Sequence, residues 1–280
     1  MCGRYAAGRR PEDLIEQFEL DLGTGDGPDH GPGLDPAGTE PDYNVAPTKT
    51  APVVLCVPGE PQAGQRQVRR LRLLIWGLVP WWAEDRGIGG RLINARAETV
   101  LDKPAFRSAV LTHRCLVPAD GWYEWQVSPT ATDARGRPRR QPFFIRPADG
   151  GSAAFAGVYD LWRDRTRHAD DPQAWLASYA VVTTKAEPGL RAVHARMPLV
   201  LPRQRWDAWL DPDRRDPDSL RALLEPAQPG RFVAVPVSAR VNAAANNGPE
   251  LLEPVPEDQL LGVVDPATGA LIGAADVPLF

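Results

Sequence analysis

Cysteine and histidine are scarce in this chain of 280 residues, which contains three cysteines and four histidines. Cys2, Cys56 and Cys115 lie far apart, and the sequence has no Cys-X-X-Cys pair and no pair of closely spaced histidines. Zinc sites use ligands grouped at short spacings, and disulfide frameworks use a denser, even set of cysteines. The sequence therefore predicts neither, and we expect no metal and no cofactor.

The chain also lacks an apolar run near the roughly 20 residues that span a bilayer. Its first residues contain no apolar signal core, so we expect a cytoplasmic protein without membrane contact. The formal net charge of −4 excludes a globally basic surface, and any nucleic-acid contact has to come from a local patch. A hydrophobic fraction of 43% and a charged fraction of 24% are ordinary for a globular protein.

Proline and glycine divide the sequence into short segments rich in Val, Ile, Leu, Phe and Trp, which favour strands. Strands are predicted over residues 52–57, 71–76, 115–118, 122–127, 142–146, 153–162, 180–184 and 232–237. Helices are predicted over residues 11–20, 103–112, 203–210 and 218–224. The expected fold class is α+β: a single domain built on a curved, largely antiparallel, barrel-like β-sheet with a few flanking helices.

Segments without periodicity and rich in helix and strand breakers are predicted as loops. They are residues 21–42, 128–141, 163–173 and 211–218. The loop at 128–141 contains four arginines, which either extend a nucleic-acid groove or are simply solvated, and solvation is the commoner outcome. Residues 1–255 are predicted to form the domain, and residues 256–280 a C-terminal tail.

The most informative residue is Cys2, which becomes the amino-terminal residue when Met1 is removed. Its α-amine and thiol then lie on adjacent carbons, as a 1,2-aminothiol. An α-amine has a pKa of roughly 7.7–8, so an appreciable fraction is neutral at pH 7 and can condense with an aldehyde. The thiol can close onto the resulting imine as a five-membered thiazolidine. The alternative is that Cys2 has no function, and the rest of the chain has to decide.

Glu124 and His194 are candidate acid–base groups. Strand alternation places Glu124 on the face of Trp122, with Tyr123 and Trp125 opposite. Burial among tryptophans raises the pKa of a carboxyl and suits it to proton transfer, whereas a surface glutamate on an edge strand is the alternative. His194 precedes a strand-like Arg-Met-Pro segment, although lone histidines are more often structural than catalytic.

Other polar and aromatic residues suggest contacts with nucleic acid. Asn94 and Arg96 are separated by one residue and can project together, although a salt bridge with Glu98 or another acid is the commoner outcome for such an arginine. Trp81 and Trp82 cannot both point inward from a proline turn, so at least one is expected to be exposed, where it can hold a base stack open. The arginines considered for phosphate contacts are Arg4, Arg96, Arg114 and Arg196.

In this order, the segments together resemble the SRAP family (SOS response-associated peptidases, or abasic site processing proteins). The matching segments are MCGRY, YNVAPT, WGLVPWW, INARAET, RCLVPADGWYEW, FAGVYDLW, VVTTKA, HARMPLVL and NNGPELLEPV, over residues 1–255. The resemblance implies a protein that binds single-stranded DNA and traps the aldehyde of an abasic site as a thiazolidine crosslink, which protects the lesion. It also implies weak lyase activity, slow crosslink reversal and autocatalytic removal of Met1, which ordinary methionine trimming would equally achieve.

The resemblance assigns roles to particular residues. It implies that Cys2 is the nucleophile, Glu124 a proton shuttle and His194 a second acid–base group, with Asn94 holding the cysteine and a sugar oxygen by hydrogen bonds. The residues implied to contact DNA are Arg4, Asn44, Pro47, Trp81, Trp82, Arg96, Thr183 and Arg196. The expected partner is single-stranded DNA containing abasic sites. The protein is expected to be a monomer and to be associated with the nucleoid when it is bound to DNA.

Three other activities fit fewer of these segments. Glutamine amidotransferases with an amino-terminal cysteine also begin Met-Cys-Gly, but they need a synthase domain, and this activity leaves the WYEW and HARMP segments unexplained. A non-covalent reader of modified DNA would make Cys2 incidental. A thiol peptidase acting on other proteins is the third alternative.

Overall fold

Five strands close into a barrel in the computed structural model, which describes residues 2–21, 40–59, 67–168, 170–260 and 262–272. The strands are β3 (Thr50–Pro58), β4 (Gln67–Trp76), β6 (Arg114–Ala119), β9 (Ala153–Arg163) and β10 (Trp175–Lys185). They pair in the order β10-β4-β3-β6-β9, and β9 pairs back with β10 to close the ring. Within the ring only the β4–β10 pairing is parallel. The predicted α+β fold on a largely antiparallel, barrel-like sheet is confirmed.

Two short strands extend the barrel along β10. They are β5 (Asn94–Arg96), which runs parallel to β10, and β11 (Arg196–Pro198), which runs antiparallel to it. Because both strands pair with Thr183, their side chains meet at one end of β10.

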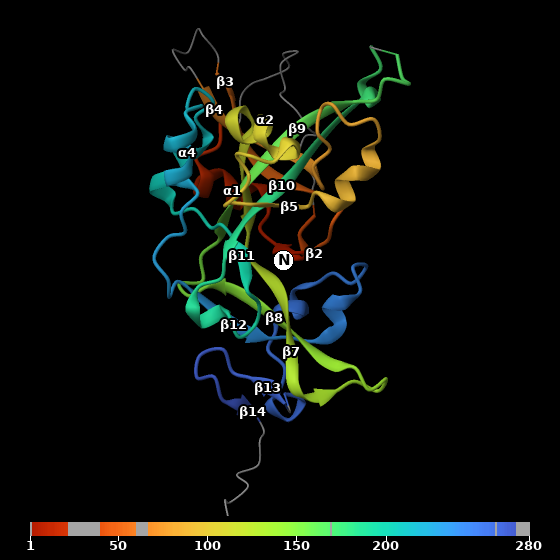
Figure 1. The fold of residues 1–280 in the computed structure, drawn as a ribbon, viewed down its shortest axis with the longest axis vertical. Helices are drawn as coiled ribbons and strands as arrows, with labels where there is room; N and C mark the ends of the chain where they lie inside the picture. The colour runs from red at the N-terminus through yellow and green to blue at the C-terminus, as the bar shows by residue number, and fades with distance from the viewer. Residues whose placement is uncertain (1, 22–39, 60–66, 169, 261, 273–280) are drawn as a thin grey trace, which may run out of the picture.

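A second, antiparallel sheet packs against this end of the barrel, in the order β12-β8-β7-β1-β2. Its strands are β1 (Tyr5–Ala7), β2 (Asp42–Val45), β7 (Gly121–Thr132), β8 (Pro138–Pro147) and β12 (Phe232–Pro236). Figure 1 shows β2 near the middle of the molecule, between the barrel above and β7, β8 and β12 below. The chain start therefore lies where the two sheets meet.

Side-chain alternation along the barrel strands separates two apolar layers. Phe155 and Tyr159 of β9 belong to the cluster inside the barrel, whereas Ala156 and Val158 belong to the cluster outside it. The outer cluster is covered by α1 (Pro11–Phe18), α2 (Pro104–Thr112), α3 (Trp206–Leu210) and α4 (Pro217–Leu223). Within the described residues, no helix has the length and apolar character needed to cross a bilayer.

Short 3₁₀ helices connect the larger elements. They are η2 (Arg86–Arg91), η3 (Pro172–Ala174), η4 (Pro188–Leu190), η5 (Arg203–Arg205), η6 (Ala239–Asn242), η7 (Pro249–Leu252) and η8 (Glu257–Gln259). All four predicted helices are present, although the predicted helix over 203–210 begins as η5 before becoming α3.

All eight predicted strands are present, and the main error concerns the predicted loop over 128–141. The structure continues β7 to Thr132 and begins β8 at Pro138, so only the tip is a turn. Cross-strand pairing overrides the polar composition here, with Thr132 opposite Pro138 after an irregularity in register. Asp133 closes the tip by accepting hydrogen bonds from the backbone of Arg135 and Arg137.

The other predicted loops have mixed outcomes. Loops over 163–173 and 211–218 are confirmed except where β9 ends and where η3 and α4 begin. Most of the predicted loop over 21–42 lies outside the described residues. The short strands β1, β2, β5 and β11 were not predicted, because three or four residues carry too little periodicity.

The described part of the predicted tail packs onto β7. β13 (Val263–Val264) and β14 (Leu271–Ile272) form a small hairpin, and Val263 is buried in the interior cluster. Gln126 exchanges hydrogen bonds with the backbone of Val264, at 2.9 Å from its amide nitrogen and 2.8 Å to its amide oxygen. The division of the chain at residue 255 stays a prediction.

Close packing inside the barrel leads to a testable prediction at Gly157. A Cβ there would lie 2.7 Å from the Cys115 sulfur and 3.0 Å from a methyl carbon of Val117. We expect Gly157→Ala to lower the free energy of unfolding by about 1–3 kcal/mol, measured by urea titration. Gly189→Ala is the control, because a Cβ at Gly189 meets nothing within 4 Å. Equal free energies of unfolding for the two variants would contradict tight packing between β6 and β9 at Gly157.

Candidate active site

Cys2 is fully buried where β1 approaches β5 and β7. The side-chain amide of Asn94, at the start of β5, donates a hydrogen bond to the Cys2 carbonyl oxygen at 2.6 Å. The Cys2 sulfur lies 3.9 Å from the carbonyl oxygen of Arg4, which also accepts a hydrogen bond from the backbone of Tyr123 in β7. Two strands from different sheets therefore hold the backbone around this cysteine.

Burial raises the pKa of the Cys2 thiol, and the negative charge of Glu124 raises it further. The thiol is therefore protonated at neutral pH in this state and needs a nearby base before it can act as a nucleophile. The Glu124 carboxylate affects the pKa of the thiol because the two side chains lie near each other.

Glu124 is almost completely buried, with 3% of its surface exposed. It lies on β7 two residues after Trp122 and on the same face of the strand, as predicted, and the structure turns that face toward the barrel. Burial raises the pKa of its carboxyl from an ordinary value of 4.5 to about 7. The prediction of a desolvated carboxyl is confirmed, and such a group can both donate and accept a proton near neutral pH.

His194 lies between η4 and β11, with its Nδ1 atom 3.7 Å from Oε1 of Glu124. The backbone N–H of Arg196 donates to the same Nδ1 atom at 3.0 Å. Burial lowers the pKa of the imidazole, so the ring is neutral at pH 7. The same Nδ1 atom lies 3.1 Å from the Arg196 carbonyl oxygen, so which of these contacts it makes depends on the tautomer of the ring.

The structure thus brings together the four residues expected to be catalytic. Cys2 precedes β1 and Glu124 lies on β7 of the second sheet, whereas Asn94 begins β5 and His194 precedes β11, the two strands that border β10. Among the residues that the structure describes, no cluster of three His, Cys, Asp or Glu side chains is suited to a metal ion. The chemistry available here is that of a thiol, a carboxyl, an imidazole and an amide.

Arg196 and Thr183 form a polar border beside this group. The guanidinium of Arg196 binds both carboxylate oxygens of Glu98, at 2.6 and 3.0 Å, and donates to the carbonyl oxygen of Thr183 at 2.7 Å. These hydrogen bonds lower the pKa of Glu98. The sequence suggested Arg96 as the partner of Glu98, but Arg96 is exposed and forms no ion pair with a described residue.

Asn44 is buried and uses its amide to hold the chain after β12. The amide oxygen accepts a hydrogen bond from Arg4 at 2.7 Å, and the amide nitrogen donates to the carbonyl oxygens of Ala243 and Asn246 at 3.0 and 2.9 Å. Arg4 also donates to the carbonyl oxygen of Val241 at 2.8 Å. Arg4 and Asn44 were expected to contact DNA. In the structure, hydrogen bonds of these two side chains connect β2 and the start of β1 to η6 and the residues after it.

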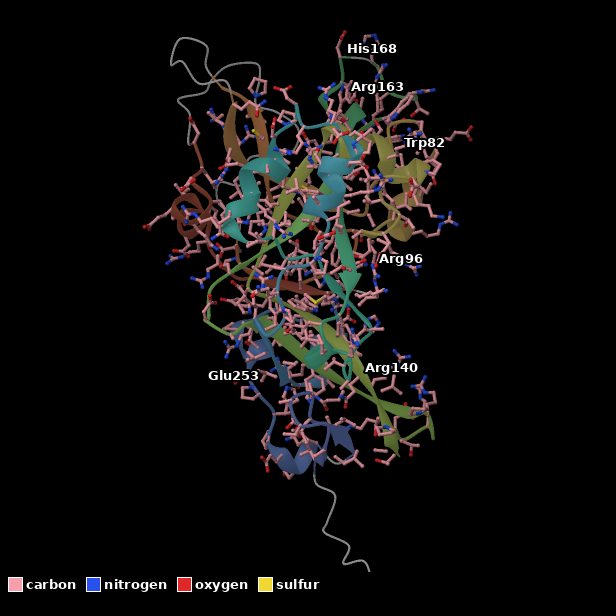
Figure 2. All side chains as sticks on the ribbon, turned by 60° about the vertical axis from the view of Figure 1, so that its left-hand side comes forward. Trp82, Arg96, Arg140, Arg163, His168 and Glu253 are labelled. Carbon is pink, nitrogen blue, oxygen red and sulfur yellow. The ribbon has the colours of Figure 1, made fainter. Side chains whose placement is uncertain are left out.

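Trp81 and Trp82 are both exposed, at 56% and 44%, so the prediction of at least one exposed tryptophan is confirmed. Figure 2 shows Trp82 and Arg96 on the same side of the molecule. Pro47 is half-buried in the turn after β2, next to Thr48, whose φ is 73°.

Arg114 was considered for a phosphate contact, and the structure shows that this is wrong. Its side chain is buried at the start of β6 and donates to four backbone carbonyl oxygens. These acceptors are Val110, Leu111, Trp209 and Asp211. A residue engaged in closing the ends of α2 and α3 is not available to DNA.

Sequence reasoning also missed polar residues that organise the site. The hydroxyl groups of Tyr5 and Tyr179 lie 2.6 Å apart in the core and join β1 to β10. Asp160 and Ser178 are buried on neighbouring strands of the barrel. The available signal was a single acid inside an apolar run, Phe-Ala-Gly-Val-Tyr-Asp-Leu-Trp.

The barrel, the second sheet and the buried Cys2 define an α+β protein in which a thiol, a carboxyl, an imidazole and an amide are grouped around residue 2. The model of the SOS response associated peptidase (SRAP) family matches residues 1–244. The abasic site processing protein YoqW of Bacillus subtilis (strain 168) is 35% identical over 253 residues, which cover 90% of this chain and 99% of YoqW. The chain therefore belongs to the SRAP family.

Two further comparisons extend this result. The abasic site processing protein HMCES of Pongo abelii is 31% identical over 245 residues, which cover 79% of this chain and 67% of HMCES. The crystal structure of a protein from Bacteroides thetaiotaomicron covers 91% of this chain and 100% of its own, with a TM-score of 0.71 at 19% identity. That likeness supports the fold.

The buried carboxyl leads to a prediction about stability. The folded state raises the pKa of the Glu124 carboxyl from 4.5 to about 7. Between these pH values the folded protein keeps a proton that the unfolded chain releases, so the free energy of unfolding of the wild type falls as the pH rises. Glu124→Gln removes this titration. We expect the variant to gain on the order of 2–3 kcal/mol over the wild type between pH 5 and pH 8, measured by urea unfolding. A difference that does not change with pH would contradict a raised pKa.

Proposed function

We propose that this protein recognises abasic sites in single-stranded DNA and links itself covalently to them through Cys2. The observation that carries the proposal is the placement of Cys2. Asn94 holds its carbonyl oxygen at 2.6 Å, beside a carboxyl with a pKa of about 7 and a neutral imidazole 3.7 Å from that carboxyl. The names of the relatives YoqW and HMCES, abasic site processing proteins, agree with this function.

The proposed reaction begins after removal of Met1 and opening of the deoxyribose ring. The α-amine of Cys2 adds to the aldehyde carbon to give a carbinolamine. Protonated Glu124 donates its proton to the carbinolamine hydroxyl, which leaves as water and yields the protonated imine. Glu124, now a carboxylate, takes the proton of the Cys2 thiol, and the sulfur adds to the imine carbon. The electron pair of the C=N bond moves to the nitrogen, which keeps its proton as the ring N–H, so the thiazolidine forms with loss of one water and Glu124 ends protonated as it began.

The other residues have supporting roles in this proposal. Asn94 fixes the Cys2 backbone, so that amine and thiol reach the same carbon. His194 serves the sugar oxygen during ring opening as a neutral imidazole, which can donate a proton from one ring nitrogen and accept one at the other. Arg96 is exposed for a phosphate contact. Arg196 would bind phosphate while it stays oriented by Glu98 and Thr183.

The tryptophans and the remaining polar residues complete the proposed DNA surface. Trp81 and Trp82 offer exposed indole faces to the bases beside the lesion, where stacking does not depend on base identity. Arg4, Asn44 and Pro47 support the strand-binding border through β2 and the turn that follows it.

The first test is covalent capture. A C-terminally tagged protein is mixed with a single-stranded oligonucleotide that carries one abasic site, and the mixture is boiled in SDS. We expect a shifted band for the wild type and for Cys56→Ala, the matched thiol control, but none for Cys2→Ala or for protein that retains Met1. An oligonucleotide with a tetrahydrofuran site, which has no aldehyde, gives no band.

The outcomes of this test separate the alternatives. A heat-stable adduct with Met1-retaining protein would refute the aminothiol mechanism. If the wild type binds the oligonucleotide but forms no adduct after Met1 removal, the protein is a non-covalent reader. Release of glutamate from glutamine would instead support an amidotransferase.

A second test concerns Glu124. We expect Glu124→Gln to slow adduct formation about 100-fold, because the variant can neither donate a proton to the leaving hydroxyl nor take one from the thiol. Two effects oppose each other above about pH 7: the carboxyl loses the proton that it donates, whereas a larger fraction of the amine becomes neutral and reactive. We therefore expect the wild-type rate to level off or fall in this range. The variant should lose this limit. Quench-flow gels from pH 5 to pH 9 measure both, and an unchanged rate removes Glu124 from the mechanism.

A further inference from the structure

The segment that carries the two exposed tryptophans is held by side chains of the barrel rather than by strand pairing. The backbone N–H of Val79 donates to the Ser178 hydroxyl at 2.8 Å, and the N–H of Trp81 donates to Oδ2 of Asp160 at 3.0 Å. The indole N–H of Trp162 donates to the Ala83 carbonyl oxygen at 2.6 Å. Val79, Trp81 and Ala83 are thus each held by one hydrogen bond. Pro80 has no N–H and cannot donate to a neighbouring strand.

The register of the barrel explains why the three anchors line up. Asp160 of β9 and Ser178 of β10 are directly opposite each other, and Trp162 lies two residues further along β9. Side chains at these positions share one face of the sheet. Asp160 and Ser178 are both buried there, under the segment that they hold.

The anchored segment has one side in the core and one in solvent. Leu78 and Val79 are buried, whereas Trp81 and Trp82 are exposed at 56% and 44%. Figure 2 shows Trp82 at the edge of the molecule. Hydrogen bonds to buried side chains hold the backbone of this segment. The backbone held in this way directs the two indoles into solvent.

Asp160 is an unusual choice for a purely structural position. Burial raises the pKa of its carboxyl, and burying a carboxylate costs free energy that its specific hydrogen bonds have to offset. One oxygen accepts from Trp81 N, while the other accepts from Leu161 N at 2.9 Å and lies 3.8 Å from Nδ1 of His113. An apolar side chain would fill this space without directing the N–H of Trp81.

We propose that Asp160, assisted by Ser178, is a positioning residue of the DNA-binding surface. It fixes the backbone at Trp81, so that the two indoles stack on bases beside the abasic site without first being ordered by the DNA. This inference rests on the proposed function, since it assigns a task to residues of the same DNA surface. Pre-ordering of this kind raises affinity because less conformational freedom is lost on binding.

The test measures the affinity of a fluorescent, undamaged single-stranded oligonucleotide by anisotropy, which separates binding from crosslinking. We expect Trp81→Ala and Asp160→Leu each to weaken binding about 10-fold. The double variant should bind no more than about twofold more weakly than Trp81→Ala alone, because both changes remove the same contact. Asp160→Asn keeps an acceptor oxygen and should restore most of the affinity. Ser178→Ala should weaken binding in the same direction.

Asp120→Leu is the matched control, because this carboxylate also accepts a backbone N–H, that of Gly8 at 2.6 Å, but outside the tryptophan segment. It should lose stability yet keep the wild-type affinity. All titrations are made below the melting temperature of each variant. Wild-type affinity in Asp160→Leu, additive losses in the double variant, or an equal loss in Asp120→Leu each overturn this inference alone. Failure of the wild type to bind any oligonucleotide overturns the proposed function and this inference with it.

Discussion

Strand β10 is the constraint on which the rest of the molecule depends, because it pairs with four other strands. It closes the barrel between β4 and β9, and its last residues also pair with β5 and β11. Tyr179 on this strand binds the hydroxyl of Tyr5 at 2.6 Å and so ties β1, the strand that follows Cys2, to the barrel. The strands that present Asn94 and Arg196 are thus positioned by one element. Distortion of β10 would move Asn94 and Arg196 together.

The site combines a buried thiol with a buried carboxyl, because both side chains lie where the two sheets meet. Removal from water raises the pKa of the Cys2 thiol and the pKa of the Glu124 carboxyl. The same burial lowers the pKa of His194 and leaves its ring neutral. A site of this kind costs stability, because the native state holds a carboxyl where an apolar group would pack at lower cost. In return, the carboxyl can exchange a proton near neutral pH.

The residues expected to contact DNA divide into two physical groups. Trp81, Trp82 and Arg96 are exposed and free to meet a ligand. Arg4 and Asn44 are engaged with each other and with the backbone near η6, so they act first by holding the edge of the site in place. Arg196 lies between these groups, since its guanidinium is at the border but is already oriented by Glu98. Arg4, Asn44 and Arg196 are therefore already oriented by contacts within the protein.

Local alternation and apolar composition along the chain were enough to predict the strand-rich α+β class, the eight longer strands, the four helices and the burial of Glu124. The ordered motifs were also sufficient to indicate the family. Other features emerge only in the folded protein: the barrel closes through β9 and β10, residues 128–141 form a paired hairpin, and Arg114 is buried. The hydrogen-bond partners of Arg196 and Trp81 also emerge only there. These features depend on contacts between residues far apart in the chain, and such contacts leave no periodic signal in a single sequence.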